Sequence, residues 1–256
     1  MRFLVAATAV ACLAGMGIAI ATPKVEEGVK TVKIMPLGDS ITGAPGCWRA
    51  LLWKKLQDAE ITNTDFVGSL RGGNCGFDYD SENEGHAGFK ATSIAAKKQL
   101  PPWLQKAHPD IVMMHLGTND VWRNISPKNT IKAFSILVKQ MRKNNPNMVI
   151  LVAQITPMNP RGCKTCSKVA EQLNSAIAKW APTKSTRKSP ITVVDCFTGF
   201  DAAKDTRDGV HPNKAGNKKL ANCWFKPLSA AIKHVSPPAC ILETRKQTPR
   251  RHLSER

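Results

Sequence analysis

The sequence is poor in aromatic and in acidic residues. Of its 256 residues only 6% are aromatic, with a single tyrosine, and 19 are Asp or Glu against 37 Lys or Arg. The resulting net charge of +18 favours an anionic partner, such as nucleic acid, a membrane surface or an acidic polymer. Hydrophobic residues make up 42% and charged residues 22%, which excludes a collagen-like, coiled-coil or disordered chain. This length accommodates one domain of ordinary size or two small ones.

Long apolar runs are also scarce, and the one that approaches the length of a membrane span lies at the N-terminus. It extends from Phe3 to Ala21 after one basic residue, is rich in Ala and Gly, and ends in the cleavage pattern Ala-Ile-Ala. An uncleaved membrane anchor is the alternative, but the cleavage pattern favours a secretory signal peptide over residues 1–21. We therefore expect a secreted, extracellular protein that begins at Thr22 and has no membrane partner.

Cysteine is sparse too, with eight residues, one of them in the expected leader. In an oxidising compartment the remaining seven are expected to pair, with one left over. Cys163-Lys-Thr-Cys166 has the spacing of some zinc and redox sites, but no second cluster completes a zinc site, so a local disulfide is favoured. The sequence alone does not determine the other pairs. Those that we expect are Cys47–Cys75 and Cys196–Cys223.

Short β-branched or apolar runs alternate with segments of helical spacing along most of the chain. This alternation predicts a parallel sheet with helices on both faces, and thus one doubly wound α/β domain within residues 22–235. The five predicted strands are Val32–Leu37, Thr64–Ser69, Ile111–Leu116, Val149–Ile155 and Ile191–Asp195. The predicted helices are Leu51–Leu56, Ile94–Leu104 with a break at Pro101-Pro102, Ile131–Met141, Val169–Trp180 and Leu220–Ile232.

Residues 236–256 differ from the rest of the chain in composition. They begin with Ser-Pro-Pro, continue as a polar and basic segment, and contain Cys240, the cysteine that the expected disulfides leave over. We interpret them as a disordered basic tail.

Three polar clusters follow predicted strands at their carboxyl ends, where open α/β sheets bind ligands. Gly-Asp-Ser-Ile-Thr contains Ser40, Gly-Thr-Asn-Asp contains Asn119, and Asp-Gly-Val-His-Pro-Asn contains Asp208 and His211. A serine, a histidine and an aspartate at one edge of a sheet have the composition of a nucleophile, its general base and the carboxylate that orients the base.

The spacing of these residues suits acyl transfer. Asp208 lies three residues before His211, close enough on one turn to accept its Nδ1–H. We expect Ser40 at a strand-to-helix turn, where its backbone N–H and the helix N-terminus behind it would favour an oxyanion. The side-chain amide of Asn119 offers a second donor, and the N–H of Gly88, in a glycine loop before a predicted helix, a third.

In this order, Gly-Asp-Ser-Ile, the glycine loop, Gly-Thr-Asn-Asp and Asp-x-x-His resemble the four blocks of the SGNH (GDSL) hydrolase superfamily. The wider segments MPLGDSITGAPGCWRALLW, NEGHAGF, DIVMMHLGTNDVW and DGVHPN resemble the secreted fungal-type carbohydrate esterases of family 3, which include acetylxylan esterases. The resemblance implies a flavodoxin-like three-layer sandwich, in agreement with the five-stranded parallel sheet predicted above. It also implies a catalytic triad of Ser40, Asp208 and His211, and an oxyanion hole formed by Ser40, Gly88 and Asn119.

Other residues near the four blocks have a structural interpretation beside a functional one. Asp39 and Trp122 are candidate substrate contacts, although a turn or capping role suits Asp39 and a core position would explain Trp122. Trp48 is interpreted as core. His86 and His115 are assigned structural hydrogen bonds, because another histidine already supplies the base. The single N-glycosylation sequon, at Asn124, is disfavoured by the proline that follows it.

From these observations we expect a serine esterase that removes acetyl groups from plant cell-wall polysaccharide, most of all acetylated xylan, as a monomer without metal or organic cofactor. A lipolytic or other short-chain esterase is one alternative, disfavoured by the lack of a long apolar lid. A catalytically silent carbohydrate-binding protein on a hydrolase fold is another. The positive surface suggests retention on an acidic wall polymer, whereas secretion and the lack of a recognition motif argue against nucleic acid.

Overall fold

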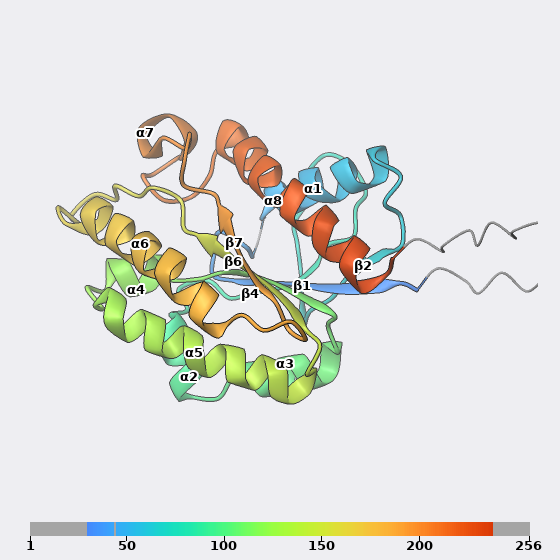
Figure 1. Cartoon of the computed structure of the whole chain (residues 1–256). Helices are drawn as coiled ribbons and strands as arrows, with labels where there is room; N and C mark the ends of the chain where they lie inside the picture. Colours follow the sequence, from blue (N-terminus) through green and yellow to red (C-terminus); the bar gives the residue numbers. More distant parts are fainter. Residues whose placement is uncertain (1–29, 44, 238–256) are drawn as a thin grey trace, which may run out of the picture.

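The structure is a computed structural model that describes residues 30–43 and 45–237. The predicted signal peptide, the predicted basic tail and Cys240 lie outside these residues. Within them, Figure 1 shows a central sheet with helices on both faces.

The described residues form one sheet of seven strands, in the order β3-β4-β1-β5-β6-β7, with β2 also paired to β1. All pairs are parallel except β3 with β4. The strands are β1 (Val32–Gly38), β2 (Thr64–Phe66), β3 (Leu70–Arg71), β4 (Glu82–Gly85), β5 (Ile111–His115), β6 (Val149–Gln154) and β7 (Ile191–Asp195). The predicted doubly wound parallel sheet is therefore confirmed.

The predicted count of five strands is wrong, because β3 and β4 were not expected. Strand β4 has the sequence Glu-Asn-Glu-Gly and contains no β-branched or apolar residue. Glu, Asn and Gly are all uncommon in strands. Strand β4 pairs with the end of β1, whereas β2 pairs with the start of β1. Both lie along the edge of β1 that is opposite to β5. The parallel part of the sheet consequently keeps the pattern of a five-stranded flavodoxin-like sheet, with β2 and β4 in tandem at one position.

The helices form the two outer layers. Figure 1 shows α1 and α8 together on one face, and α5 and α6 on the other. The helices are α1 (Cys47–Asp58), α2 (Ala91–Ala96), α3 (Leu100–Ala107), α4 (Thr118–Trp122), α5 (Pro127–Asn144), α6 (Cys166–Lys184), α7 (Ala202–Asp205) and α8 (Lys214–Val235). Pro101 and Pro102 lie in the first turn of α3, where a missing N–H costs no helical hydrogen bond, so they follow the break instead of causing it.

The buried core agrees with the apolar pattern of the sequence. All five residues of β5 are buried, as expected for a strand covered on both faces. Trp48 is 1% exposed and stacks on Trp224 of α8 with ring centroids 6.0 Å apart, which confirms its core position. The three expected disulfides are present, and no helix in the described ranges is long and apolar enough to cross a membrane.

Candidate active site

The fold brings together three side chains that are far apart in the sequence. The Oγ atom of Ser40, after β1, lies 2.9 Å from Nε2 of His211, which is 171 residues away. The Nδ1 atom of His211 lies 2.7 Å from Oδ2 of Asp208. The three groups thus form the continuous hydrogen-bonded chain that transfers a proton from a serine to a histidine held by a carboxylate.

Asp208 is fixed by more than its contact with the imidazole. Its Oδ1 accepts the backbone N–H groups of Val210 and His211 at 3.0 and 2.8 Å. Partial burial opposes ionisation, but the N–H and the ring of His211 and the N–H of Val210 outweigh it and hold the pKa of Asp208 below its ordinary value. The carboxylate therefore remains ionised and able to orient the histidine in acidic solution.

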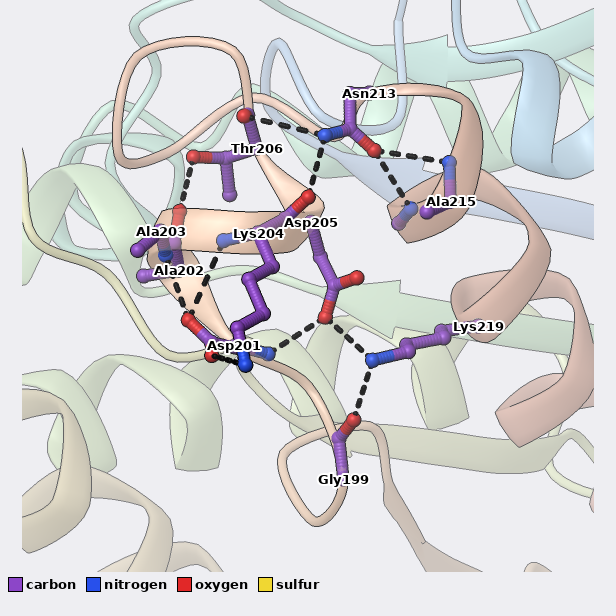
Figure 2. A network of polar contacts seen from close by, with 11 residues as sticks. Gly199, Asp201, Ala202, Ala203, Lys204, Asp205, Thr206, Asn213, Ala215 and Lys219 are labelled. Atoms are coloured by element: carbon purple, nitrogen blue, oxygen red, sulfur yellow. Dashed lines mark hydrogen bonds and ion pairs between the residues drawn. The ribbon is translucent and has the colours of Figure 1, made fainter.

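The loop that carries Asp208 and His211, residues 206–213, is anchored at both ends by a polar network (Figure 2). Before the loop, Asp205 accepts a hydrogen bond from Nζ of Lys219 in α8 at 2.6 Å. After it, the side chain of Asn213 accepts the first free N–H groups of α8 and donates to the carbonyl of Lys204 at 2.7 Å. Both ends of this loop, which we call the His211 loop, are consequently tied to helices α7 and α8.

Ser40 lies on a tight turn, and the expected helix N-terminus behind it is not there. The N–H groups of Thr42 and Gly43 donate to the carbonyl of Asp39 at 3.1 and 2.9 Å, whereas α1 begins only at Cys47. That part of the prediction was wrong, because the turn closes on itself before the chain enters the helix. Any oxyanion stabilisation here comes from local N–H groups and not from the α1 dipole.

Two side chains of α1 hold this turn in place. The indole N–H of Trp48 donates to the carbonyl of Ile41 at 2.8 Å. Arg49, which is fully buried, donates to the carbonyls of Thr42 and Gly43 at 2.7 and 3.2 Å. Burial lowers the pKa of Arg49 to about 10, so the guanidinium stays charged at neutral pH. The turn is therefore supported from α1 through its carbonyl groups, and these contacts do not involve the backbone N–H of Ser40.

Asp39 is not a substrate contact. Its side chain is fully buried and accepts the N–H of Ile41 at 3.0 Å, so the prediction of a substrate-facing carboxylate is corrected to the alternative turn role. Burial raises the pKa of Asp39 to about 6, although the N–H of Ile41 and the charge of His211 oppose this shift. Ser40 is thus preceded in the chain by a buried carboxyl group whose pKa is close to neutral pH.

The three predicted oxyanion donors come from three separate segments: the turn after β1, the glycine loop and helix α4. Within the described residues the backbone N–H groups of Ser40 and Gly88 donate to no acceptor. Gly88 has φ +77°, a left-handed conformation that favours glycine. One amide hydrogen of Asn119, on α4, is used by the carbonyl of Phe89 at 3.0 Å, which leaves the second for a ligand. These groups have the chemistry required to hold a negatively charged oxygen.

Asp120 holds the loops of Gly88 and Asn119 together. It lies beside Asn119 on α4, and its carboxylate accepts the N–H groups of Ala91 and Thr92 at 2.7 and 3.1 Å, which caps α2. Burial raises the pKa of Asp120, while the hydrogen bonds from Thr92 and Ala91 oppose the rise. A capping role, rather than a substrate contact, therefore accounts for this residue.

Sequence reasoning missed a buried pair next to the glycine loop. Glu84 has no exposed side-chain surface and accepts both the N–H and the Oγ–H of Ser69, at 2.9 and 2.7 Å, as well as a contact of 2.5 Å from Nε2 of His86. The ring of His86 stacks on Phe89 and on Trp103, with ring centroids 4.9 and 4.3 Å away. The i, i+2 spacing of Glu84 and His86 in an extended segment could have indicated this pair, because such residues share a face.

Trp122 and His115 differ in their exposure to solvent. Trp122 is 41% exposed on α4, three residues after Asn119, so its ring is available to a ligand. His115 is buried, and its ring nitrogens contact no hydrogen-bonding group of the described residues, so the structural hydrogen bond expected for it is not found there. Desolvation lowers the pKa of His115 to about 4, which keeps it neutral. No group of three metal-ligating side chains occurs in the ranges that the structure describes.

Comparison with known protein families gives one match over most of the chain. The sequence profile of the GDSL-like lipase/acylhydrolase family matches residues 37–219, which include every residue of the triad. A multidomain esterase of Ruminococcus flavefaciens is 28% identical over 261 residues, which cover 93% of this chain but 34% of that protein. The chain therefore spans about a third of the length of this relative.

Among solved structures, the similarity extends over most of this chain and over the whole of the other chain. A carbohydrate esterase of family 3 from Talaromyces cellulolyticus superimposes with a TM-score of 0.73 and 35% identity, over 80% of this chain and all of the other. A mutant of an acetyl esterase, crystallised with an acetate ion, gives a TM-score of 0.73 and 34% identity over the same shares. The predicted resemblance to the GDSL hydrolases, with family 3 esterases among the neighbours, is confirmed.

Proposed function

The chain belongs to the GDSL-like lipase/acylhydrolase family of ester hydrolases, and we propose that it is a serine esterase that removes O-acetyl groups from plant cell-wall polysaccharide, with acetylated xylan as its substrate. The observation that carries the proposal is the continuous chain from Ser40 through His211 to Asp208. The backbone N–H groups of Ser40 and Gly88, which have no acceptor among the described residues, supply candidate donors to an oxyanion. The similarity to acetyl and family 3 carbohydrate esterases supports acetyl as the acyl group and carbohydrate as the alcohol.

In the first half of the reaction, Oγ of Ser40 attacks the acetyl carbonyl carbon and His211 takes its proton on Nε2. The carbonyl oxygen becomes an oxyanion, which the N–H groups of Ser40 and Gly88 and the amide of Asn119 stabilise. His211 then gives the proton to the sugar oxygen, which leaves as a free hydroxyl. The enzyme keeps the acetyl group as an ester of Ser40.

In the second half, water replaces the sugar. His211 takes a proton from the water, the resulting hydroxide attacks the acetyl-serine carbonyl, and the same donors hold the second oxyanion. Collapse of this intermediate returns the proton to Oγ of Ser40 and releases acetate. Asp208 accepts a hydrogen bond from Nδ1 throughout and so keeps Nε2 facing the serine.

We further propose that the protein acts outside the cell and that its positive surface retains it on an acidic wall polymer. Three disulfides fit an oxidising compartment. Attraction between surface lysines and an acidic polymer is screened by salt. Retention on glucuronoxylan or pectin that is the same at low and high salt would contradict this part of the proposal.

The esterase activity is tested by acetate release from acetylated xylan. We expect wild type and the Ser167→Ala variant, which changes an exposed serine of α6, to release acetate equally. Ser40→Ala should lower the rate by at least about 10³-fold, since the nucleophile is lost. Equal rates for Ser40→Ala and wild type would refute the mechanism. Faster hydrolysis of long-chain than of acetyl esters would instead favour the lipolytic alternative.

A further inference from the structure

A hollow of about 360 Å³ adjoins the His211 loop on the side of α1 and α8. The start of α1, the segment around Phe77, the first turns of α8 and the end of the His211 loop line it. Its volume falls within the range of small-molecule sites. The hollow therefore borders the loop that carries His211 and has the size of a ligand site.

One wall of the hollow is apolar. Pro45, Leu51, Phe77 and Pro212 contribute to it, and Phe77 is 37% exposed although aromatic side chains are few in this protein. The disulfide between Cys47 and Cys75 joins the start of α1 to the segment that carries Phe77. This wall is accordingly a fixed apolar surface, of the kind on which the C–H face of a sugar ring packs.

The hollow is also lined by positively charged side chains. Arg207, Lys214 and Lys218 line the hollow, and none of them forms an ion pair with a described residue. Lys219, the next residue along α8, differs because it is engaged by Asp205. No Asp or Glu lines the hollow. Three positive charges thus surround a space without a negative partner, which favours an anionic ligand.

The hollow is directly connected to the triad through the backbone. The N–H of Arg207 donates to the carbonyl of His211 at 2.9 Å, and Pro212 follows His211 in the chain. Asn217, on the first turns of α8, adds a side-chain amide with no hydrogen-bond partner in the part of the chain that the structure describes. A ligand in the hollow would therefore meet charge, an apolar face and a hydroxyl-binding amide beside the reacting ester.

From this combination we propose that the hollow is a subsite for a carboxylated sugar, a uronic acid unit of the polysaccharide. The ring packs on the apolar surface formed by Pro45, Leu51 and Phe77. The carboxylate is attracted by Lys214 and Lys218, and Asn217 binds a hydroxyl. This proposal rests on the proposed function, since it places the uronic acid in the same polysaccharide that carries the acetyl group. It makes acidic xylan a better ligand than neutral xylan.

The proposal is tested by calorimetric binding of xylo-oligosaccharides without acetyl groups, one substituted with glucuronic acid and one neutral of equal length. We expect wild type to bind the acidic ligand about two- to tenfold more tightly, as expected for ion pairs at a partly exposed site. In Lys214→Gln/Lys218→Gln this preference should disappear. Phe77→Ala should weaken both ligands, because the apolar wall serves either ring.

The matched control is Lys139→Gln/Lys143→Gln, which removes the same charge from exposed positions on α5 at the opposite face of the sheet. It should keep the preference for the acidic ligand. An equal loss in both double variants, or equal affinity of wild type for the two ligands, would overturn the subsite. Because binding of unacetylated sugar requires no hydrolysis, a failure of acetate release would refute the proposed function while leaving this result intact.

Discussion

The Nε2 atom of His86 lies 2.5 Å from Oε1 of Glu84, a carboxylate with no exposed side-chain surface. The pair spans the point where β4 ends and the glycine loop begins. The N–H of His86 also donates to the carbonyl of Gly38 at the end of β1, at 3.0 Å. The loop that presents Gly88 is therefore attached both to the strand before Ser40 and to the protein interior.

Replacing Glu84 tests how far this buried pair stabilises the fold. Glu84→Gln leaves one acceptor oxygen for three donors, so we expect the free energy of unfolding to fall by about 2–4 kcal/mol, measured by urea denaturation. The control is Glu82→Gln on the same strand, whose ion pair with Arg71 is exposed, and which should cost less than about 1 kcal/mol. Equal losses in the two variants would contradict the assignment.

The proposed role of Gly88 as an oxyanion donor can be tested separately from its contribution to the stability of the fold, because Gly199 has the same left-handed backbone. Both Gly88 and Gly199 have φ +77°, and a Cβ added to either would meet nothing within 4 Å. Gly88→Ala and Gly199→Ala should therefore each cost about 1 kcal/mol of unfolding free energy. Only Gly88→Ala is expected to lower kcat for an acetyl ester, by about tenfold or more, because it displaces an oxyanion donor. Similar kcat values for both variants would exclude Gly88 from the oxyanion hole.

The carboxylate of Asp208 is expected to act through charge and orientation. Asp208→Asn keeps the shape but loses the anion and can favour the wrong tautomer of His211, so kcat should fall by about 10²–10⁴-fold. The control Asp78→Asn changes an exposed aspartate and should leave kcat unchanged. Steady-state kinetics on an acetyl ester provide the measurement, and a fall of less than threefold in Asp208→Asn would remove Asp208 from the triad.

The buried carboxyl of Asp39 predicts a pH dependence of stability. Its pKa is raised by burial to about 6 in the folded state, against about 3.9 for an unfolded chain. Between these values the folded state holds a proton that the unfolded state has lost, so the contribution of Asp39 to stability falls as the pH increases. Above about pH 6 this contribution is lost completely, by an amount on the order of 3 kcal/mol.

Asp39→Asn removes this titration. We expect the variant to gain stability relative to wild type as the pH is raised from about 4 to about 8, by up to the same 3 kcal/mol. Urea denaturation at several pH values in this range measures the difference. A constant difference between the two proteins would show that Asp39 does not titrate there.

Much of the fold followed from local patterns. The parallel strands β1, β5 and β6 were predictable because they are apolar and buried on both faces, and β7 because it is rich in β-branched residues although it is partly exposed. Strand β4 was not, since Glu82–Gly85 is polar and forms a strand only because β1 offers an unpaired edge. The helix expected behind Ser40 was also misplaced, because a turn closed by hydrogen bonds to Asp39 is invisible to hydrophobic periodicity.

The sequence by itself determined which side chains could carry the chemistry, since Ser40, Asn119, Asp208 and His211 each follow a strand in a recognisable block. It also indicated the α/β architecture and the Cys163–Cys166 disulfide, because both depend on composition and short-range spacing. Only the tertiary structure decided that Asp39 is buried, that Glu84 pairs with His86, and that Lys214 and Lys218 line the same hollow as Phe77. Burial and charge neutralisation depend on which distant segments pack together, and local sequence does not encode those contacts.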